Sequence, residues 1–380
     1  MPRLRRRDFL KNASGMLAGS WLIRTTGSLA KTDELIKVGV ITEPSGSHLG
    51  SYLKSLAGCQ GIEQIALADE TGETFGQARS ILGGRFAKLR TFREYHEMIK
   101  VIKPDMALVT LQAHRMPSAI RIALEGNCHV LAEKHPCVRI EDFEPLVRTA
   151  ESKQRHLILA FANRFSPLVK KAKELVQSGL LGKLFGTDVY LIADQTRLKN
   201  PEYQQSWRAL KDKAGGGHLV ALGIHYLDLV QFITNDKVRQ VCGFSQNVGG
   251  QPIEVEDAAV AALQFENGMV GTLHSGYYLD HSYHTQIVIW GSQGWLRFNL
   301  IEKTPLRWYS SAAGSPTQVQ SFSDTTDFLS NQYLPLVQAA VNAARGIEQP
   351  PLNGAEGLQV LKAVFGFYSA AKTGSTQIIS

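Results

Sequence analysis

Short apolar runs alternate with helical patterns in the first half of the chain. Five runs, at 37–41, 64–68, 106–110, 129–132 and 157–161, are apolar at consecutive positions. Runs of this length fit parallel strands that helices cover on both faces. Helical periodicity is clear between them, for example at 117–125 and 140–153. This half of the chain predicts a doubly wound α/β domain of the Rossmann type.

The pattern changes after residue 164. A helix is expected at 167–178, and residues 329–371 return to helical periodicity. Several extended segments alternate apolar and polar residues, as one-sided antiparallel sheets do; they lie at 185–193, 238–246, 258–265, 269–278, 285–291 and 295–300. We therefore expect a Rossmann domain at 31–160, an α+β domain with an open, mainly antiparallel sheet at 161–328, and a C-terminal helical segment at 329–380.

The first thirty residues have the pattern of an export signal. Arg6 and Arg7 precede an apolar stretch at 13–23, and the small-residue pattern at 28–30 suits a signal peptidase. Residues 1–30 are therefore expected to be a twin-arginine (Tat) signal, with the Tat translocase as a partner during export and a periplasmic or otherwise exported location. The alternative is an uncleaved leader that anchors the protein in a membrane.

Charge and cysteine content exclude several classes of function. Residues 1–30 hold six of the 41 Lys and Arg and one of the 34 Asp and Glu, so 35 basic and 33 acidic residues remain. The basic character belongs mostly to the leader, and no nucleic-acid partner is expected. The four cysteines show neither metal-ligand spacing nor a disulfide framework, so no metal site is predicted and free thiols are expected.

The first strand-to-helix turn, at 39–50, is an atypical dinucleotide loop. Thr42 and Pro44 stand where the first two glycines of the usual fingerprint would be, while Gly46 and the amides after it can still present a helix N-terminus to phosphate. The predicted cofactor-binding residues of this loop are Thr42, Ser45, Gly46, Ser47 and His48.

Asp69 ends the second apolar run, about twenty residues after the loop, as ribose binding requires. A carboxylate there would bind the free 2′-hydroxyl and repel a 2′-phosphate, which favours NAD over NADP. The alternative is that Asp69 only stabilises the turn at the end of its strand.

Two segments carry a resemblance to a known family. Glu133-Lys134-His135-Pro136 and the stretch 215–228, which begins with three glycines and contains His225, resemble the lysine element and the glycine-rich histidine helix of the Gfo/Idh/MocA family. The resemblance extends from residue 36 to about 374. It implies an NAD(P)-binding Rossmann domain and chemistry on sugars, cyclitols or related polyols.

The resemblance also implies residue roles. Lys134 and His225 would be the catalytic residues that handle the proton of the reacting hydroxyl. The cofactor would additionally be contacted by Thr110, Leu111, Gln112, Glu133, Lys134 and Asn163. The family commonly covers the open face of the second sheet with another subunit, so a homo-oligomer is expected there.

Charged and aromatic residues near these motifs are candidate contacts to a polyhydroxylated ligand. For each of them, ordinary surface or core packing is the alternative. The predicted substrate-binding residues are Asp194, Arg197, Trp207, Arg208, His218 and Tyr278.

One expected catalytic group is absent. The family motif has an aspartate four residues before the histidine, and Ala221 occupies that position. Either His225 acts with Lys134 alone, or another side chain such as His218 or Asp194 substitutes, or the protein no longer performs the standard oxidation. We favour the first of these.

These observations predict an exported NAD-dependent oxidoreductase for a sugar, cyclitol or polyol derivative. Because an exported enzyme cannot draw on free NAD, its cofactor should stay tightly bound. Two alternatives remain open: an NAD-dependent glycoside hydrolase that works by transient oxidation, elimination and re-reduction, and a sugar-binding protein without catalysis.

Overall fold

The computed structural model describes residues 34–302, 304–326 and 328–379, so the expected leader at 1–30 lies outside the described residues. The first domain is built on a six-stranded parallel sheet with the order β3-β2-β1-β4-β5-β6. Its strands are β1 (Ile36–Thr42), β2 (Ile62–Ala68), β3 (Arg90–Phe92), β4 (Met106–Thr110), β5 (His129–Ala132) and β6 (Leu157–Leu159). Its helices are α1 (Leu49–Gly58), α2 (Phe75–Leu82), α3 (Tyr95–Ile102), α4 (Met116–Glu125) and α5 (Ile140–Ser152).

This sheet confirms the predicted Rossmann architecture. The strand order reverses between β1 and β4, and ligands of such folds bind beyond the carboxyl ends of the strands at that point. Five of the six strands correspond to predicted runs. The sixth, β3, was not predicted because it has three residues, of which only Phe92 is buried.

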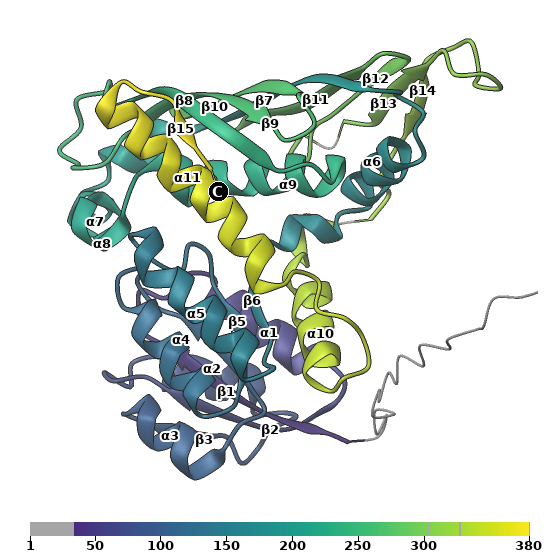
Figure 1. The fold of residues 1–380 in the computed structure, drawn as a ribbon. Coiled ribbons are helices and arrows are strands. Elements are labelled where there is room, and N and C mark those ends of the chain that lie inside the picture. The colour runs from purple at the N-terminus through teal and green to yellow at the C-terminus, as the bar shows by residue number, and fades with distance from the viewer. Residues whose placement is uncertain (1–33, 303, 327, 380) are drawn as a thin grey trace, which may run out of the picture.

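The second domain carries a nine-stranded open sheet with the order β14-β13-β12-β11-β7-β10-β9-β8-β15 (Figure 1). Its strands are β7 (Leu184–Asp194), β8 (Val238–Gln246), β9 (Ala258–Phe265), β10 (Val270–Leu279), β11 (His284–Gly291), β12 (Gly294–Phe298), β13 (Leu306–Ser310), β14 (Gln320–Phe322) and β15 (Gln377–Ile378). Only β7 and β10 pair in parallel; all other neighbours are antiparallel. The predicted α+β class is confirmed, whereas the edge strands β13, β14 and β15 are additional.

Helices cover one face of this sheet, toward the first domain (Figure 1). The main ones are α6 (Pro167–Gln177), α9 (Ile224–Thr234) and α11 (Gly354–Thr373). Short elements connect them: 3-10 helices η1 (Ala162–Phe165), η2 (Gln195–Lys199) and η3 (Trp207–Ala209), helices α7 (Pro201–Gln205) and α8 (Lys211–Ala214), the π-helical turn η4 (Leu219–Gly223), and the 3-10 helix η5 (Phe328–Ser330).

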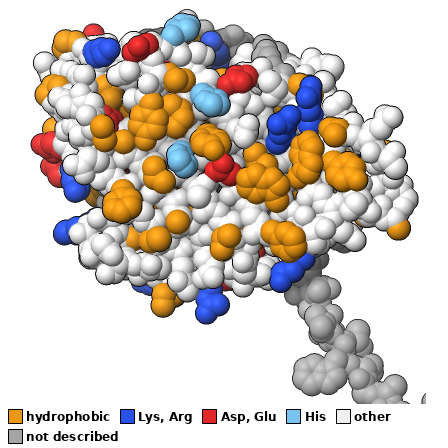
Figure 2. All heavy atoms as spheres, turned by 90° about the horizontal axis from the view of Figure 1, so that it is seen from above, with side chains coloured by type: hydrophobic (Ala, Val, Ile, Leu, Met, Phe, Trp, Pro, Cys, Tyr) orange, Lys and Arg blue, Asp and Glu red, His pale blue; other side chains and the backbone are white. Residues whose placement is uncertain are grey.

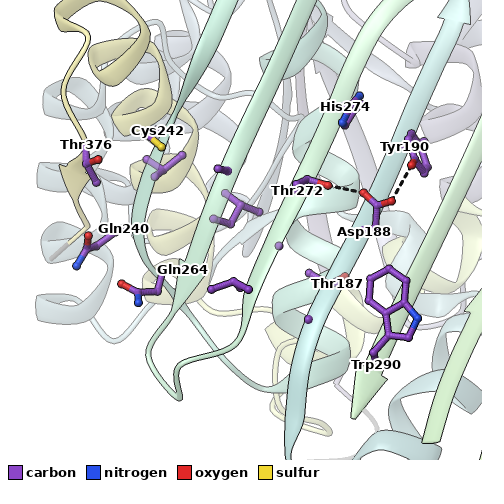
Figure 3. Close-up of a pocket in the computed structure, with 16 residues that line it drawn as sticks. Thr187, Asp188, Tyr190, Gln240, Cys242, Gln264, Thr272, His274, Trp290 and Thr376 are labelled. Atoms are coloured by element: carbon purple, nitrogen blue, oxygen red, sulfur yellow. Dashed lines mark hydrogen bonds between the residues drawn. The ribbon is translucent and has the colours of Figure 1, made fainter.

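The outer face of the same sheet is not covered by any described element and gathers apolar side chains (Figure 2). Phe244 is 83% exposed and Trp290 is 42% exposed. A shallow hollow of about 700 Å³ runs over this face (Figure 3). At its floor, Asp188 accepts hydrogen bonds from Thr272 and from the Tyr190 hydroxyl, the latter at 2.7 Å.

The C-terminal segment does not form one continuous helical unit. Helix α10 (Tyr333–Ala344) packs on α1 and contributes Leu336 and Val337 to the core of the first domain. Helix α11 begins at a capping box between Asn353 and Glu356, and packs against α5 and β8. The two C-terminal helices therefore pack on both domains: α10 packs on the first, and α11 contacts both.

Two further observations concern the described residues as a whole. None of their helices combines the length and the apolarity that crossing a membrane requires. All four cysteines are free thiols, as expected; Cys59, Cys128 and Cys137 are buried and Cys242 is partly exposed.

Candidate functional site

The loop after β1 lies tightly against the end of β4. The amide of Gly46 donates to the Glu43 carbonyl at 2.9 Å, and a Cβ on Gly46 would come within 2.5 Å of the Thr110 carbonyl oxygen. The Thr110 hydroxyl donates to the Ser47 carbonyl at 2.7 Å. A side chain at Gly46 would push the loop off the sheet, which explains why this glycine is present although the first two of the usual fingerprint are replaced.

Among the described residues, no side chain caps the N-terminus of α1, and the first turn of this helix contains no acidic residue. The first amides of a helix have no intrahelical acceptor, and together with the helix dipole they favour a phosphate group. The loop therefore fits the pyrophosphate of a dinucleotide, with Ser47 and His48 at the helix entrance.

Several predicted cofactor residues lie around this entrance. The Gln112 side-chain amide donates to the Ser45 hydroxyl at 3.1 Å, and the Gln112 backbone amide donates to Glu43. Thr42 is buried at the end of β1. The Leu111 side chain belongs to the core, so only the Leu111 backbone is available to a ligand. Asn163 is partly buried in η1, directly after β6.

The Asp69 carboxylate forms its hydrogen bonds within its own turn. Its two carboxylate oxygens accept hydrogen bonds from the backbone amides and hydroxyls of Thr71 and Thr74, at 2.9–3.0 Å. Burial would raise the pKa of Asp69, but these bonds outweigh it and lower the pKa. With 1% of its surface exposed, Asp69 stabilises the turn in this structure. The predicted contact with ribose requires this turn to rearrange.

Glu133 lies at the centre of a buried cluster at the carboxyl end of β5. Its carboxylate accepts a hydrogen bond from the Tyr52 hydroxyl, and His48 Nδ1 lies 3.2 Å from its Oε1. Lys134 Nζ lies 4.0 Å from the same oxygen. Burial would raise the pKa of Glu133, but the charges and hydrogen bonds of these neighbours outweigh it, so the pKa is lowered and the group is a carboxylate.

Lys134 points from the first domain toward the glycine segment of the second. Its Nζ donates to the Ala221 carbonyl at 2.8 Å, and its side chain is 7% exposed. Burial lowers the pKa of Lys134; Glu133 opposes this, while the nearby Arg208 and Arg197 lower it further. The Lys134–His135 peptide bond is cis. A lysine with a lowered pKa can exchange protons closer to neutrality.

His225 lies beside this lysine. Burial, and then the charges of Lys134 and His48, hold its pKa well below 6.5, so the imidazole is neutral. Its Nδ1 is buried without a hydrogen-bond partner among the described residues. The structure thus brings together the two residues expected to be catalytic, and a backbone carbonyl at position 221 binds the lysine where the family has an aspartate.

The glycine segment is packed tightly against neighbouring backbone and side chains. A Cβ on Gly217 would lie 1.9 Å from the Glu256 carbonyl oxygen, and one on Gly216 would lie 2.2 Å from the Tyr368 hydroxyl. The Glu256 carboxylate accepts the amides of Gly217 and Leu219 at 2.6 and 3.0 Å. These glycines let η4 and α9 pack against Glu256 and α11.

Arg208, from η3, links the two domains. Its Nη2 donates to the Ser47 hydroxyl at 2.7 Å, and its guanidinium lies 4.7 Å from the ring centre of Trp207. Arg197, from η2, lies over the Tyr277 ring at 5.6 Å. Arg197, Trp207 and Arg208 thus lie on the second-domain side of Lys134.

His218 is completely buried next to this group. Its Nδ1 lies 2.7 Å from the Ser275 hydroxyl, and its ring meets the edge of Tyr277 at 4.4 Å. Burial lowers its pKa to about 3, so it is neutral. Its Nε2 and the Trp207 indole nitrogen have no hydrogen-bond partner among the described residues.

Two predicted substrate residues have other roles in this structure. Tyr278 is on the outer face of the sheet, where its ring would meet a Cβ on Gly276, because strand residues alternate between faces. Its neighbour Tyr277 faces Arg197 instead. Asp194 uses its carboxylate to accept the Thr196 amide at 2.7 Å and so stabilises the start of η2.

The sequence reasoning missed Tyr52, and it selected Tyr278 as a substrate contact in place of its neighbour Tyr277. Tyr52 lies four residues after His48, so both can face Glu133 from the start of α1, and this spacing was a usable signal. Tyr277 differs from Tyr278 only in strand parity, which the bulge between Tyr277 and Leu279 made hard to assign. Asp228, in the same motif as His225, forms a buried ion pair with Arg164 at 2.6 Å.

In the described part of the chain, no three His, Cys, Asp or Glu residues lie close enough together to hold a metal ion.

Comparison with known proteins agrees with this geometry. Residues 45–161 match the model of an oxidoreductase family with an NAD-binding Rossmann fold, and residues 169–297 match the GFO/IDH/MocA C-terminal domain. The chain is 23% identical to D-glucoside 3-dehydrogenase of Escherichia coli K12 over 333 residues, which cover 83% of this chain and 89% of the relative.

Solved structures share the fold over nearly the whole chain. A levoglucosan dehydrogenase in complex with NADH and L-sorbose superposes with a TM-score of 0.81 at 16% identity, covering 91% of this chain and 99% of that one. An oxidoreductase from Agrobacterium radiobacter, in complex with NAD+, L-tartaric acid and magnesium, gives 0.76 at 19% identity, covering 90% and 98%. With both family models matched in order, the chain belongs to the Gfo/Idh/MocA family of oxidoreductases, whose N-terminal domain binds NAD.

Proposed function

We propose that the protein oxidises or reduces a hydroxyl-bearing carbon of a sugar, cyclitol or polyol derivative with NAD. The observation that carries this proposal is the meeting of Lys134 and His225 beside an uncapped helix N-terminus at the carboxyl edge of the Rossmann sheet. The relative named D-glucoside 3-dehydrogenase and the structure of levoglucosan dehydrogenase support a carbohydrate substrate.

The chain's own residues divide the work at the reacting hydroxyl. Lys134, held by the Ala221 carbonyl, takes up the hydroxyl proton during oxidation when its amine is neutral, and returns it during reduction. His225 is neutral, and its imidazole orients the same hydroxyl by a hydrogen bond. Because Ala221 has no carboxylate, His225 lacks the proton partner usual in this family.

NAD, when bound, accepts the hydride from the substrate carbon or returns it. Ser45, Gly46, Ser47 and His48 would hold its pyrophosphate. Glu133 would fix its nicotinamide half, together with the loop at 110–112. We further propose NAD rather than NADP, because the carboxylates of Glu43 and Glu70, both paired with Arg115, and the carboxylate of Asp69 at the end of β2 would disfavour a 2′-phosphate.

We also propose that the protein is exported through the Tat route with its cofactor already bound. The twin arginines at 6 and 7 and the apolar stretch after them support this. A protein folded before export can carry a bound cofactor with it.

Finally, we propose that two copies of the chain associate through the outer face of the nine-stranded sheet. The exposed apolar side chains there, including Phe244 and Trp290, support an interface, since exposed apolar patches often mark protein–protein contacts.

Analysis of the bound cofactor tests the central proposal. Protein purified from its native compartment should release stoichiometric NAD(H), and no NADP(H), on denaturation, as measured by mass spectrometry. Lys134→Met should keep this cofactor but lose activity on the best sugar by about 10²-fold or more, because proton transfer typically contributes that much.

A matched control replaces an exposed lysine far from the site, Lys88→Met, and should leave both cofactor and activity unchanged. Absence of any bound or bindable nicotinamide cofactor would overturn the enzyme proposal and favour a sugar-binding protein. A Lys134→Met variant with full activity would remove the lysine from the chemistry.

A further inference from the structure

The second-domain wall of the site is rich in hydrogen-bond donors, and the Tyr277 hydroxyl, which accepts from Arg197, is an acceptor beside them. Arg197, Arg208 and the Trp207 indole contribute N–H groups, and none of these groups can accept a hydrogen bond. The Trp207 nitrogen is buried without a partner among the described residues, in a side chain that is 9% exposed. Such a donor indicates that something which accepts a hydrogen bond belongs beside it.

Both guanidinium groups have unused donors. Arg208 donates to Ser47 at 2.7 Å, and Arg197 makes one long contact of 3.4 Å to the Tyr277 hydroxyl. Within residues 34–302 and the two shorter described segments, neither has a carboxylate oxygen within 4.0 Å, the distance at which ion pairs such as Arg115–Glu43 are recognised. Their aromatic neighbours, Trp207 and Tyr277, hold the guanidinium planes without neutralising them.

The nearby carboxylates are already engaged. Glu133 is bound to Tyr52 and His48, and Asp194 to the Thr196 amide. The charges of Arg197 and Arg208 both act on Lys134, and that of Arg197 also acts on His218. The site between the domains therefore carries more positive than negative charge.

The positive charge of the site and its hydrogen-bond donors together indicate the chemical class of the ligand. A neutral sugar hydroxyl both donates and accepts, whereas a carboxylate or a phosphate only accepts and carries the compensating charge. Arginine binds such oxyanions with two parallel N–H bonds, which fixes orientation as well as affinity.

We propose that the substrate is an anionic carbohydrate, a sugar acid or a sugar phosphate, whose oxyanion group is bound by Arg197 and Arg208. This rests on the proposed function, because it places the anionic group beside the hydroxyl that Lys134 serves. The Trp207 indole donates a further hydrogen bond to the same ligand.

Calorimetric titration of the NAD-loaded protein tests this with matched sets of sugars. Glucose, glucuronate and glucose 6-phosphate form one set; galactose, galacturonate and galactose 6-phosphate form the other. At least one anionic member should bind about tenfold more tightly than its neutral parent. The acid and phosphate arms separate a carboxylate from a phosphate ligand. Tighter binding of the neutral parents, or no binding of any anionic member at millimolar concentration, overturns the proposal.

Variants assign the effect to the two arginines. Arg197→Gln and Arg208→Gln should each reduce the preference for the anionic sugar by about tenfold, and Arg197→Lys should retain part of it because the charge remains. Arg121→Gln, at an exposed arginine of α4 paired with Glu125, is the control and should change nothing.

The affinity for NAD, measured on the same variants, tests whether the two arginines bind the pyrophosphate of NAD and not the sugar. This affinity should change less than about twofold. If Arg208→Gln weakens NAD and leaves sugar preference intact, Arg208 binds the dinucleotide pyrophosphate and its assigned role is wrong. A wild-type protein that binds no NAD contradicts the proposed function itself, whereas one that binds NAD without preferring anionic sugars contradicts only this inference.

Discussion

At the scale of single residues, the electrostatic surroundings of Lys134 matter more than its place in a motif. The amine is buried, bound to a backbone carbonyl, 4.0 Å from one carboxylate and influenced by two arginines. Burial and the arginines favour the neutral amine, and Glu133 favours the charged one. The balance lowers the pKa, which makes the lysine a usable base.

The pH dependence of sugar oxidation should reflect this balance. Oxidation needs the neutral amine, so the rate should rise with pH and level off below the pH at which an ordinary lysine, with a pKa of 10.5, would lose its proton. Arg208→Gln removes a cation that disfavours protonation. The Lys134 pKa should then rise, and the profile of kcat against pH should move to higher pH.

The matched control for this profile is Arg121→Gln, which should superpose on the wild type. An unchanged profile in Arg208→Gln would mean that another group controls the proton transfer.

The residue scale also shows where sequence reasoning succeeds. Glu133, Lys134 and His225 could be identified because short motifs fix them at the ends of regular elements. Asp69 and Asp194 could not be judged in the same way, because each forms hydrogen bonds within its own turn that leave no periodic signal. Tyr278 was assigned to the wrong face, since a shift of one position reverses the side of a strand.

At the scale of elements, residues 215–217 form a tightly packed joint between η4 and the neighbouring segments of the chain. Gly215, Gly216 and Gly217 let the chain pass against Val138, Tyr368 and Glu256, and the Glu256 carboxylate binds two amides at the start of η4. The packing of this joint fixes the position of the Ala221 carbonyl, which binds Lys134, and the position of His225. The π-helical turn before α9 is consistent with a functional position, where such turns are frequent.

Gly217→Ala should therefore destabilise the protein and disturb the site together. The added Cβ would overlap the Glu256 backbone, so the segment must move and buried amides lose their acceptor. We expect a loss of about 2–4 kcal/mol in the free energy of unfolding, measured with denaturant, and a lower kcat.

Gly76→Ala is the matched control in the same experiment. Gly76 lies in helix α2 with nothing within 4 Å of the new methyl group. Alanine should stabilise that helix by about 0.5–1 kcal/mol. Equal effects of the two substitutions would show that the joint tolerates a side chain.

The sequence predicted most elements of both sheets because their central strands carry unambiguous apolar patterns. The strands it missed, β3, β13, β14 and β15, are short and lie at or near sheet edges, where few side chains are buried. Such strands are held by backbone pairing with a neighbour, and that pairing has no signature in the composition of the strand itself.

At the scale of the whole molecule, the outer sheet face is a surface that no described element covers, and apolar side chains lie on it (Figure 2). Aromatic residues near the centre of an interface usually carry most of its binding energy. Trp290, at the edge of the hollow in Figure 3, is the best such candidate.

Trp290→Glu should convert an oligomer into a monomer at micromolar concentration, as measured by sedimentation velocity or light scattering after gel filtration. A buried, unpaired carboxylate opposes association strongly. Val101→Glu places the same change on an exposed residue of α3 and should leave the mass unchanged. A wild-type protein that is already monomeric would contradict the interface.

The packing of α10 on α1 has a consequence for synthesis on the ribosome. Tyr333, Leu336 and Val337 complete a core whose other side chains, such as Leu49 and Leu53, are translated almost three hundred residues earlier. A nascent chain released before residue 344 would leave that apolar surface bare, however well its own strands had formed. The first domain is translated first, but its core is complete only after α10 has been made. Burial of this core therefore requires a chain that reaches the end of α10.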